Sequence, residues 1–291
     1  MKYYVAIILL LFAILPIRSV TKRALLVGIS DYPSNETVKA AVWSSIHGAN
    51  DVEILKKTLK NQGFQVNTLT NSNAKASNIR KAFDKLYNEV IKGDIVYIHF
   101  SCHGQPVEDK NGDEKDGWDE SIVPFDAWKK PIKGIYDGKN HILDDELNSL
   151  VGKIRNKIGS TGFVYVVVDA CHSGGIDRGE EDDDVYLRGT DSGFSLSDKA
   201  YIPRMDTRSN IPIVAVEGWA DMCMLEACRA YQSNHEIEVN GSFYGPLSFY
   251  INQILKNCTL SSDTKWIQAV KRKMDENPKL INQNMVIQIT K

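Results

Sequence analysis

The sequence has no excess of charge of either sign. Its 291 residues contain 35 lysines and arginines against 37 aspartates and glutamates, which gives a formal net charge of −2. A chain with this balance lacks the broad positive field that attracts nucleic acid, and no basic helix indicates a membrane surface. The chemistry of its partners has to be inferred from local groups of residues.

Long hydrophobic runs are also missing. Residues 5–17 form an apolar segment that is shorter than the ~20 residues needed by a membrane-spanning helix. This segment follows a short positive start, a pattern typical of a secretory signal. We therefore expect residues 1–20 to be a signal peptide, residues 21–291 to form one domain, and the protein to be exported, either to a periplasm or as a secreted protein. An uncleaved membrane anchor is the alternative.

Cysteine is scarce, and its spacing excludes the usual C-x₂-C metal sites. The five cysteines stand at positions 102, 171, 223, 228 and 258. An odd number in an exported chain leaves at least one thiol unpaired. Cys223 and Cys258 lie in apolar contexts and suit buried positions, whereas Cys171 lies in a glycine-rich segment. A free thiol is therefore expected.

The sequence does contain a regular alternation of short apolar runs and amphipathic segments. β-Branched runs bounded by turn residues predict buried strands, and apolar residues at helical spacing predict helices. Their alternation predicts an α/β fold, a three-layer sandwich with a mostly parallel six-stranded sheet flanked by helices. We expect strands at 23–29, 64–69, 95–100, 163–168, 222–227 and 285–289, and helices at 48–61, 77–92, 141–156, 246–256 and 264–274.

Two of these strands each lead into a Cys-His pair in a glycine-containing turn. Residues 101–104 read Ser-Cys-His-Gly, and residues 169–175 read Asp-Ala-Cys-His-Ser-Gly-Gly. In open α/β sheets, chemistry collects beyond the carboxyl ends of the strands. A thiol needs a neighbouring base to become a nucleophilic thiolate, and the glycines allow backbone N–H groups to turn toward an oxyanion. If the two strands are neighbours, His103 and Cys171 supply the base and the thiol.

These two segments closely resemble the caspase-like cysteine peptidases, and among them the metacaspases. The resemblance extends from about residue 23 to residue 289 and includes the run 226–236. It implies a caspase-like topology and hydrolysis through an acyl-thioester intermediate, with no cofactor required for the chemistry. It also implies that His103 is the general base, Cys171 the nucleophile, and the backbone amides of Gly104 and Cys171 the oxyanion hole.

The resemblance extends to a substrate pocket. Asp169 lies two residues before the nucleophile, and similarity to metacaspases adds Asp51 and Ser101 as pocket walls. Two carboxylates in one cleft favour a guanidinium or ammonium group and repel an acidic one. We expect protein or peptide substrates cleaved after Arg or Lys. The alternatives are that Asp51 is a favourable helix-start charge and that Asp169 holds a loop together.

Residues 105–140 are rich in aspartate and glycine and predict a long loop with a small hairpin near 121–125. This acidic region resembles the place where many metacaspases bind activating calcium, a hard cation that prefers oxygen ligands. The resemblance implies ligands at Asp119, Asp144, Asp145 and Asp177, although the spacing is not that of an EF-hand. A solvated acidic loop is the alternative.

Residues 173–210 form the least regular part of the chain, and basic residues are scattered through them. An enzyme that cleaves after Arg or Lys could cut itself in such an exposed segment. The candidate self-processing sites are Arg178, Arg188, Lys199, Arg204 and Arg208.

Two other classes of function compete with a peptidase. The fold could serve as an inactive binding module, because a fold alone does not establish catalysis. Alternatively, Cys102, His103, Cys171 and His172 offer two thiols and two imidazoles for zinc. Adjacent residues at a strand end point in opposite directions, so we expect Cys102 and His172 to be bystanders rather than ligands.

Overall fold

The computed structural model describes residues 20–34, 41–171, 186–190, 192–203, 205, 208 and 210–290. Except for residue 20, the expected signal peptide lies outside this described part. So do residues 173–185 of the expected processing loop. No helix within the described ranges combines the length and the apolar character needed to cross a membrane.

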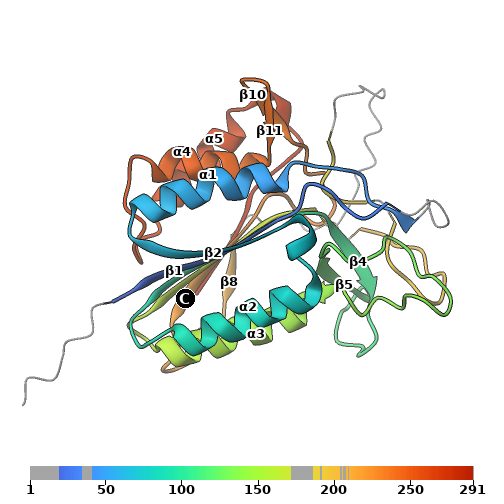
Figure 1. Ribbon diagram of the computed structural model, residues 1–291, viewed down its shortest axis with the longest axis horizontal. Helices are drawn as coiled ribbons and strands as arrows, with labels where there is room; N and C mark the ends of the chain where they lie inside the picture. Colours follow the sequence, from blue (N-terminus) through green and yellow to red (C-terminus); the bar gives the residue numbers. More distant parts are fainter. Residues whose placement is uncertain are drawn as a thin grey trace, which may run out of the picture.

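A seven-stranded sheet forms the centre of the molecule (Figure 1). Its order is β2-β1-β3-β7-β9-β12-β8, and the first five strands in this order are parallel. β12 runs antiparallel to β9 and parallel to β8. The strands are β1 (Lys22–Gly28), β2 (Phe64–Thr70), β3 (Ile95–Ser101), β7 (Phe163–Asp169), β8 (Asn210–Ile213), β9 (Asp221–Glu226) and β12 (Val286–Thr290).

The expected mostly parallel sheet is therefore confirmed, but the expected number of six strands is wrong by one. The additional strand, β8, is only four residues long and contains Pro212. β8 lies at the edge of the sheet, where a proline is tolerated because the backbone N–H that it lacks need not pair with a neighbouring strand. A run this short, with a proline inside it, gives no clear strand pattern in the sequence.

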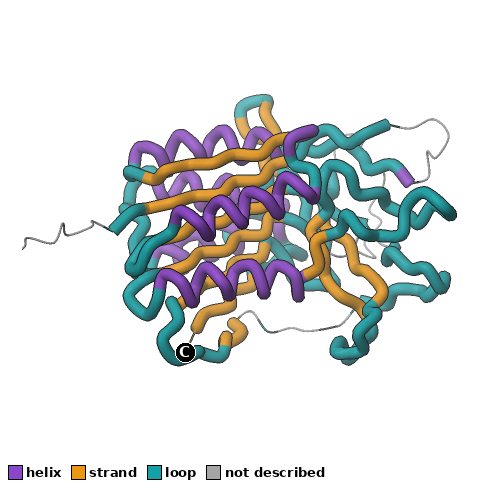
Figure 2. The backbone as a smooth tube through the Cα atoms, turned by 60° about the horizontal axis from the view of Figure 1, so that its bottom comes forward, coloured by secondary structure: helices purple, strands orange, loops and turns teal. Residues whose placement is uncertain are grey.

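Helices cover both faces of the sheet, as the two views in Figures 1 and 2 show. One face carries α1 (Gly48–Asn61), α4 (Pro246–Leu255) and α5 (Trp266–Asp275), and the other carries α2 (Ala76–Glu89) and α3 (Asp144–Ile158). This arrangement confirms the three-layer sandwich. Three helices begin elsewhere than expected: α3 starts at residue 144, α5 at residue 266, and α2 at residue 76, where a distant carboxylate, that of Asp126, accepts the first N–H.

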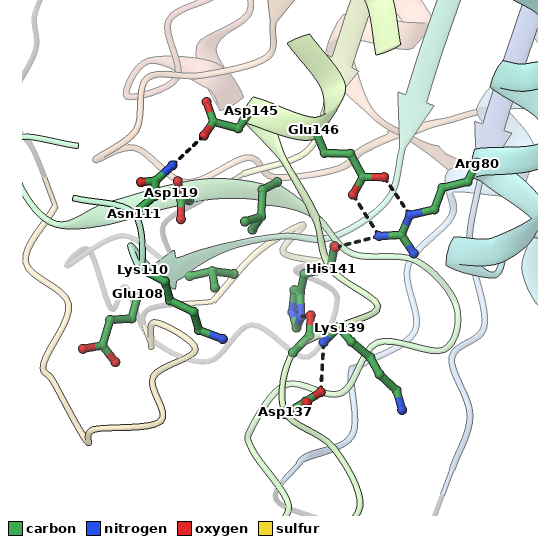
Figure 3. A pocket seen from close by; sticks show the side chains of 13 residues that line it. Arg80, Glu108, Lys110, Asn111, Asp119, Asp137, Lys139, His141, Asp145 and Glu146 are labelled. Carbon is green, nitrogen blue, oxygen red and sulfur yellow. Dashed lines mark hydrogen bonds and ion pairs between the residues drawn. The ribbon is translucent and has the colours of Figure 1, made fainter. Parts of the chain in front are cut away.

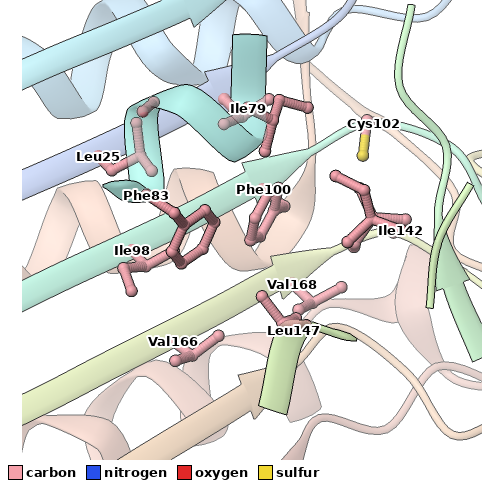
Figure 4. Packing of buried hydrophobic residues seen from close by; sticks show 14 of the residues in the cluster. Leu25, Ile79, Phe83, Ile98, Phe100, Cys102, Ile142, Leu147, Val166 and Val168 are labelled. Carbon is pink, nitrogen blue, oxygen red and sulfur yellow. The ribbon is translucent and has the colours of Figure 1, made fainter. Parts of the chain in front are cut away.

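The alternation of side chains along the strands divides the core into two clusters. In β3, Ile98 and Phe100 pack with α2 and α3, as Figure 4 shows, whereas Tyr97 packs on the opposite face with α1 and α4. Each large side chain buried in this way contributes about 1.5–3 kcal/mol. The two layers thus fix the directions of β3 and β7 and the points at which these strands end.

A smaller sheet lies beside the carboxyl ends of the central strands. It consists of β4 (Gly104–Glu108), β5 (Trp118–Ile122) and β6 (Ile142–Leu143). The hairpin expected near residues 121–125 therefore lies earlier, because β4 begins immediately after His103 and pairs with β5. A second hairpin, β10 (Ile237–Val239) with β11 (Ser242–Tyr244), turns at Asn240 and Gly241, which have φ of 54° and 76°.

Candidate active site

The ends of β3 and β7 lie side by side, as expected. The two strands pair in parallel with Ser101 opposite Asp169. Beyond the strand ends, the backbone N–H groups of Gly104 and Cys171 donate to one acceptor, the carbonyl oxygen of Arg188, at 3.3 and 2.9 Å. Two N–H donors on one carbonyl oxygen polarise that carbonyl toward nucleophilic attack and stabilise the negative charge that attack creates.

The side chain of Arg188 fills a closed pocket formed by three residues that were predicted to recognise a basic group. Its Nη2 donates to Asp51 at 2.8 Å, and its Nη1 donates to the Ser101 hydroxyl at 2.6 Å. Asp169 completes the set, with one carboxylate oxygen 3.7 Å from Nη1. Arg188 is fully buried. The three predicted pocket residues therefore surround one guanidinium.

A fourth pocket residue, Glu236, was not predicted. Its carboxylate accepts from both Nε and Nη2 of Arg188, at 3.0 and 2.8 Å. Glu236 comes from an irregular segment, which an antiparallel bridge between Leu187 and His235 holds against the residues around Arg188. The family-like run 226–236 contains Glu236, but its position in the sequence gave no indication that it reaches the pocket.

Gly245 closes the pocket because no side chain would fit there. A Cβ on this residue would lie 2.2 Å from the Asp169 carboxylate and 2.4 Å from Nη1 of Arg188. Its backbone N–H also donates to Asp51 at 3.1 Å. The pocket wall thus includes backbone as well as side chains.

The pocket concentrates negative charge around one cation. Burial raises the pKa of Asp51 to about 7, and nearby Asp169 adds to this shift, while Arg188 opposes it. Burial also acts against the charged guanidinium of Arg188, but the surrounding carboxylates outweigh burial and raise its pKa. Asp51 is therefore not a simple helix-start charge, because its carboxylate is ionised most favourably when a cation fills the pocket.

His103 lies buried between two aromatic rings. Its ring stacks on Trp43 with centroids 4.7 Å apart, and Tyr32 lies at 5.1 Å on a tilted plane. Nε2 is 2.9 Å from the carbonyl oxygen of Ser44, which can only accept, so Nε2 carries the proton. Burial lowers the pKa of His103 to about 3, so the ring is neutral. Nδ1, which has no hydrogen-bond partner among the described residues, is left as a free base.

The thiol of Cys171 is also buried, and it donates to the carbonyl oxygen of Gln232 at 2.6 Å. The neighbouring thiol of Cys228 lies 3.5 Å from the same oxygen. A hydrogen bond with Cys171, together with burial, raises the pKa of Cys228. Within the part of the chain that the structure describes, Nδ1 of His103 has no partner, so the Cys171 thiol is turned toward residue 232 rather than bonded to the imidazole.

The peptide bond that follows Arg188 lies directly over Cys171. A Cβ on Gly189 would come within 2.4 Å of the carbonyl oxygen of Cys171 and 3.0 Å of its Cβ. The Arg188 side chain therefore lies in the pocket, its carbonyl oxygen accepts from two backbone amides, and Gly189 packs against the backbone of Cys171.

The comparison with protein families decides the assignment: residues 21–287 match the caspase domain of the Peptidase C14 family. The chain belongs to the caspase family of peptidases. Among curated relatives, it is 33% identical over 171 residues to metacaspase-7 of Arabidopsis thaliana and 24% identical over 266 residues to metacaspase-1 of Schizosaccharomyces pombe. These matches cover 55% and 80% of this chain, but only 37% and 60% of the two relatives.

A solved structure supports the fold of this caspase domain independently. Protein GSU0716 from Geobacter sulfurreducens superposes with a TM-score of 0.62 and 21% sequence identity, covering 93% of each chain. The caspase-like fold expected from the sequence is confirmed.

The acidic residues of the caspase domain gather beside the second sheet. Carboxylate oxygens of Asp109, Asp113 and Asp119 lie within 4.8 Å of one another. Burial, followed by neighbouring carboxylates, raises the pKa of Asp119 to about 6 and that of Asp144 to about 7. The charge of Asp145 contributes to both shifts. Asp177 lies outside the described residues.

This donor set suits a hard cation such as calcium. Oδ1 of Asp144 is buried and has no partner among the described residues. Asp119 and Asp145 also line a cavity of about 440 Å³, shown in Figure 3, whose lining includes the basic residues Arg80 and Lys110 and also His141. Asp109 was missed by the sequence analysis, although oxygen-bearing residues at 109, 111 and 113 alternate in a pattern that could have indicated it.

The predicted self-processing sites of the caspase domain have different surroundings. Arg178 and Arg204 lie outside the described residues. The Lys199 amine donates to the carbonyl oxygen of Gly117 at 3.0 Å, and Arg208 is exposed. Of the three described candidates, only Arg188 lies in the acidic pocket.

The geometry gives no support to the zinc alternative. The Cys102 thiol packs in the apolar cluster shown in Figure 4, and burial raises its pKa to about 12. A protonated thiol in an apolar core cannot act as a zinc ligand. His172 lies outside the described residues. Cys223 is buried in the other cluster, as expected, whereas Cys258 is only half-buried.

Proposed function

We propose that the protein is a cysteine endopeptidase that cleaves after Arg or Lys, with Cys171 as nucleophile and His103 as general base. One observation carries the proposal. A single residue, Arg188, places its guanidinium among carboxylates and its carbonyl oxygen on the amides of Gly104 and Cys171. The same pocket and amide pair would bind a basic residue of a substrate.

The proposed reaction begins when the thiol of Cys171 turns from the Gln232 carbonyl toward the substrate. Nδ1 of His103 takes the thiol proton, and the thiolate attacks the carbonyl carbon of the basic residue. The N–H groups of Gly104 and Cys171 bind the resulting oxyanion; one such donor accounts for ~10²–10³ in rate in other acyl-transfer enzymes. The tetrahedral intermediate then collapses: the C–N bond breaks, and the imidazolium of His103 gives its proton to the leaving amine. Water hydrolyses the resulting thioester, with the imidazole again acting as base.

We propose further that the chain processes itself at the bond between Arg188 and Gly189. While Arg188 fills the pocket, no other basic residue can enter it, so the uncut chain is blocked by its own segment. Cleavage leaves Arg188 as a carboxyl terminus, which can leave the pocket and admit substrates. Arg188 supports this proposal better than Lys199 or Arg208, which lie elsewhere on the surface.

Calcium is proposed as an activator, bound by Asp119, Asp144 and Asp145, with Asp177 as a further ligand. The fit rests on the carboxylate oxygens of Asp109, Asp113 and Asp119, which lie within 4.8 Å of one another, and on the unpartnered oxygen of Asp144. The ion would take no part in the chemistry itself. Export is proposed from the sequence of residues 1–20, and amino-terminal sequencing of the protein from its host would test it.

The peptidase proposal is tested with a reporter peptide that releases a fluorophore after Arg. Cys171→Ala and His103→Ala should abolish its hydrolysis, since they remove the nucleophile and the base. Cys258→Ala, which removes a half-buried thiol from another part of the domain, is the matched control and should retain the rate. Equal rates in all four proteins, or no hydrolysis by the wild type with and without calcium, would favour the inactive binding module.

A further inference from the structure

The Asp169 carboxylate accepts three hydrogen bonds from other parts of the protein, in addition to its contact with Arg188. Its Oδ1 accepts from the Asn234 side chain at 2.8 Å. Its Oδ2 accepts from both the backbone N–H and the hydroxyl of Ser248, at 2.8 and 2.6 Å. Ser248 lies in the first turn of α4, so the helix that covers the sheet also fixes one side of the pocket.

A chain of polar side chains continues behind Ser248. Nε2 of His99 lies 2.9 Å from the Ser248 hydroxyl, and Nδ1 of His99 lies 3.2 Å from the Tyr97 hydroxyl. His99 and Tyr97 are fully buried. Tyr97, His99 and Ser101 are every second residue of β3, so their side chains lie on the same face of the strand. This face therefore carries both the series of hydrogen bonds and one wall of the pocket.

The direction of each bond in this chain is fixed by its last acceptor. The Asp169 carboxylate can only accept, so the Ser248 hydroxyl donates its hydrogen bond to that carboxylate. The Ser248 oxygen must therefore accept a hydrogen bond from Nε2–H of His99. The other nitrogen of His99 then accepts from the Tyr97 hydroxyl. Burial lowers the pKa of His99 to about 4, which keeps the ring in this neutral form. A hydroxyl held from both sides cannot rotate away from the carboxylate.

We propose that Tyr97, His99 and Ser248 form a positioning relay that holds the Asp169 carboxylate toward the pocket and thereby strengthens binding of a basic residue. The inference rests on the proposed function, because a basic residue must bind in this pocket. His99 is a positioning residue in this scheme: it acts through Ser248 and contacts neither the substrate nor the reacting atoms.

His99→Phe, which keeps a ring but removes the donor to Ser248, tests the relay. It should raise KM for an Arg-ended peptide about tenfold while kcat per active site stays within twofold, because the amide pair and His103 are unchanged. His99→Gln provides a new N–H donor and should restore most of the affinity. The matched control is Thr58→Val, which removes another buried side-chain hydrogen bond to α4, from Thr58 of α1 to Asn252, without touching Asp169.

Ser248→Ala provides the second measurement. It removes the hydroxyl but keeps the backbone donor, so it should reproduce the rise in KM, and adding His99→Phe should increase KM no further. The relay is overturned if Gln and Phe at position 99 behave alike, if Thr58→Val gives the same loss, or if the two changes are additive. Wild-type protein that does not hydrolyse the Arg-ended peptide would instead refute the proposed function.

Discussion

The carbonyl oxygen of Arg188 accepts a hydrogen bond from the backbone N–H of Cys171 at 2.9 Å. The other end of the same residue reaches the carboxylates of Asp51 and Glu236. The distance between pocket and amide pair therefore matches the length of one arginine side chain. Pocket occupancy and carbonyl polarisation are coupled through this residue, which explains how recognition of a basic side chain would align the next peptide bond with the thiol.

Glu236→Gln should weaken recognition of arginine more than recognition of lysine. The carboxylate of Glu236 accepts from Nε as well as Nη2 of Arg188, and lysine has no counterpart of Nε. A hydrogen bond to a charged group contributes about 1.5–3 kcal/mol, so its loss should decrease kcat/KM for Arg substrates about 10- to 100-fold. Paired Arg and Lys reporter peptides measure this difference. Glu238→Gln, an exposed carboxylate nearby, serves as control, and equal losses on both substrates would contradict the assignment.

Gly245→Ala should close the pocket to arginine. Its Cβ would stand 2.4 Å from Nη1 of the bound guanidinium and 2.2 Å from the Asp169 carboxylate, so one of them has to move. We expect at least a tenfold rise in KM and slower cleavage after Arg188, measured on the reporter peptide and by gel electrophoresis. Ser242→Ala in the neighbouring hairpin is the control. An unchanged KM would show that substrates do not bind where Arg188 lies.

Gly189→Val should stop self-processing at the bond that follows Arg188. The valine Cβ would meet the carbonyl oxygen of Cys171 at 2.4 Å, and backbone of this kind cannot yield as a flexible side chain can. Mass spectrometry of the purified chain should show an intact bond after Arg188, whereas Thr190→Ser should be cut like the wild type. Equal cutting of the valine variant would mean that the segment does not react in the observed pose.

Calcium affinity should fall as the pH is lowered through 7 to 6. The pKa values of Asp144 and Asp119 are raised to about 7 and about 6, so in metal-free protein these carboxyls take up protons in this range. Calcium binds the ionised form, and binding should release protons. Titration calorimetry at pH 8 and pH 5.5 measures both effects. Asp119→Asn should weaken the pH dependence, because Asp144 alone then titrates, and the exposed control Glu276→Gln should leave it unchanged. Identical affinity of the wild-type protein at both pH values would contradict a site at these residues.

The sequence was sufficient to predict the features that depend on local patterns. The apolar runs that end in Cys-His pairs predicted β3 and β7. In the structure these two strands pair in parallel, which places Ser101 beside Asp169. The register of two buried strands follows from their hydrophobic residues, which have only one way to fill both layers.

Features that depend on distant contacts could not be predicted in this way. Glu236 reaches the pocket because two backbone hydrogen bonds, from its N–H to Tyr186 and from the N–H of Arg188 to Asn234, tie two irregular segments together. Neither segment has a periodic pattern. Likewise, α2 begins where Asp126 caps it from another part of the chain, so the nearby serine at position 77 was a misleading signal.

The mass of the purified chain, with and without calcium, tests the central claim most directly. Incubated wild-type protein should yield a fragment that begins at Gly189, while Cys171→Ala and His103→Ala should remain uncut at this bond. An intact bond between Arg188 and Gly189 in wild-type protein that hydrolyses an Arg-ended reporter, or a cut at this bond in the Cys171→Ala protein purified without active enzyme, would contradict the account.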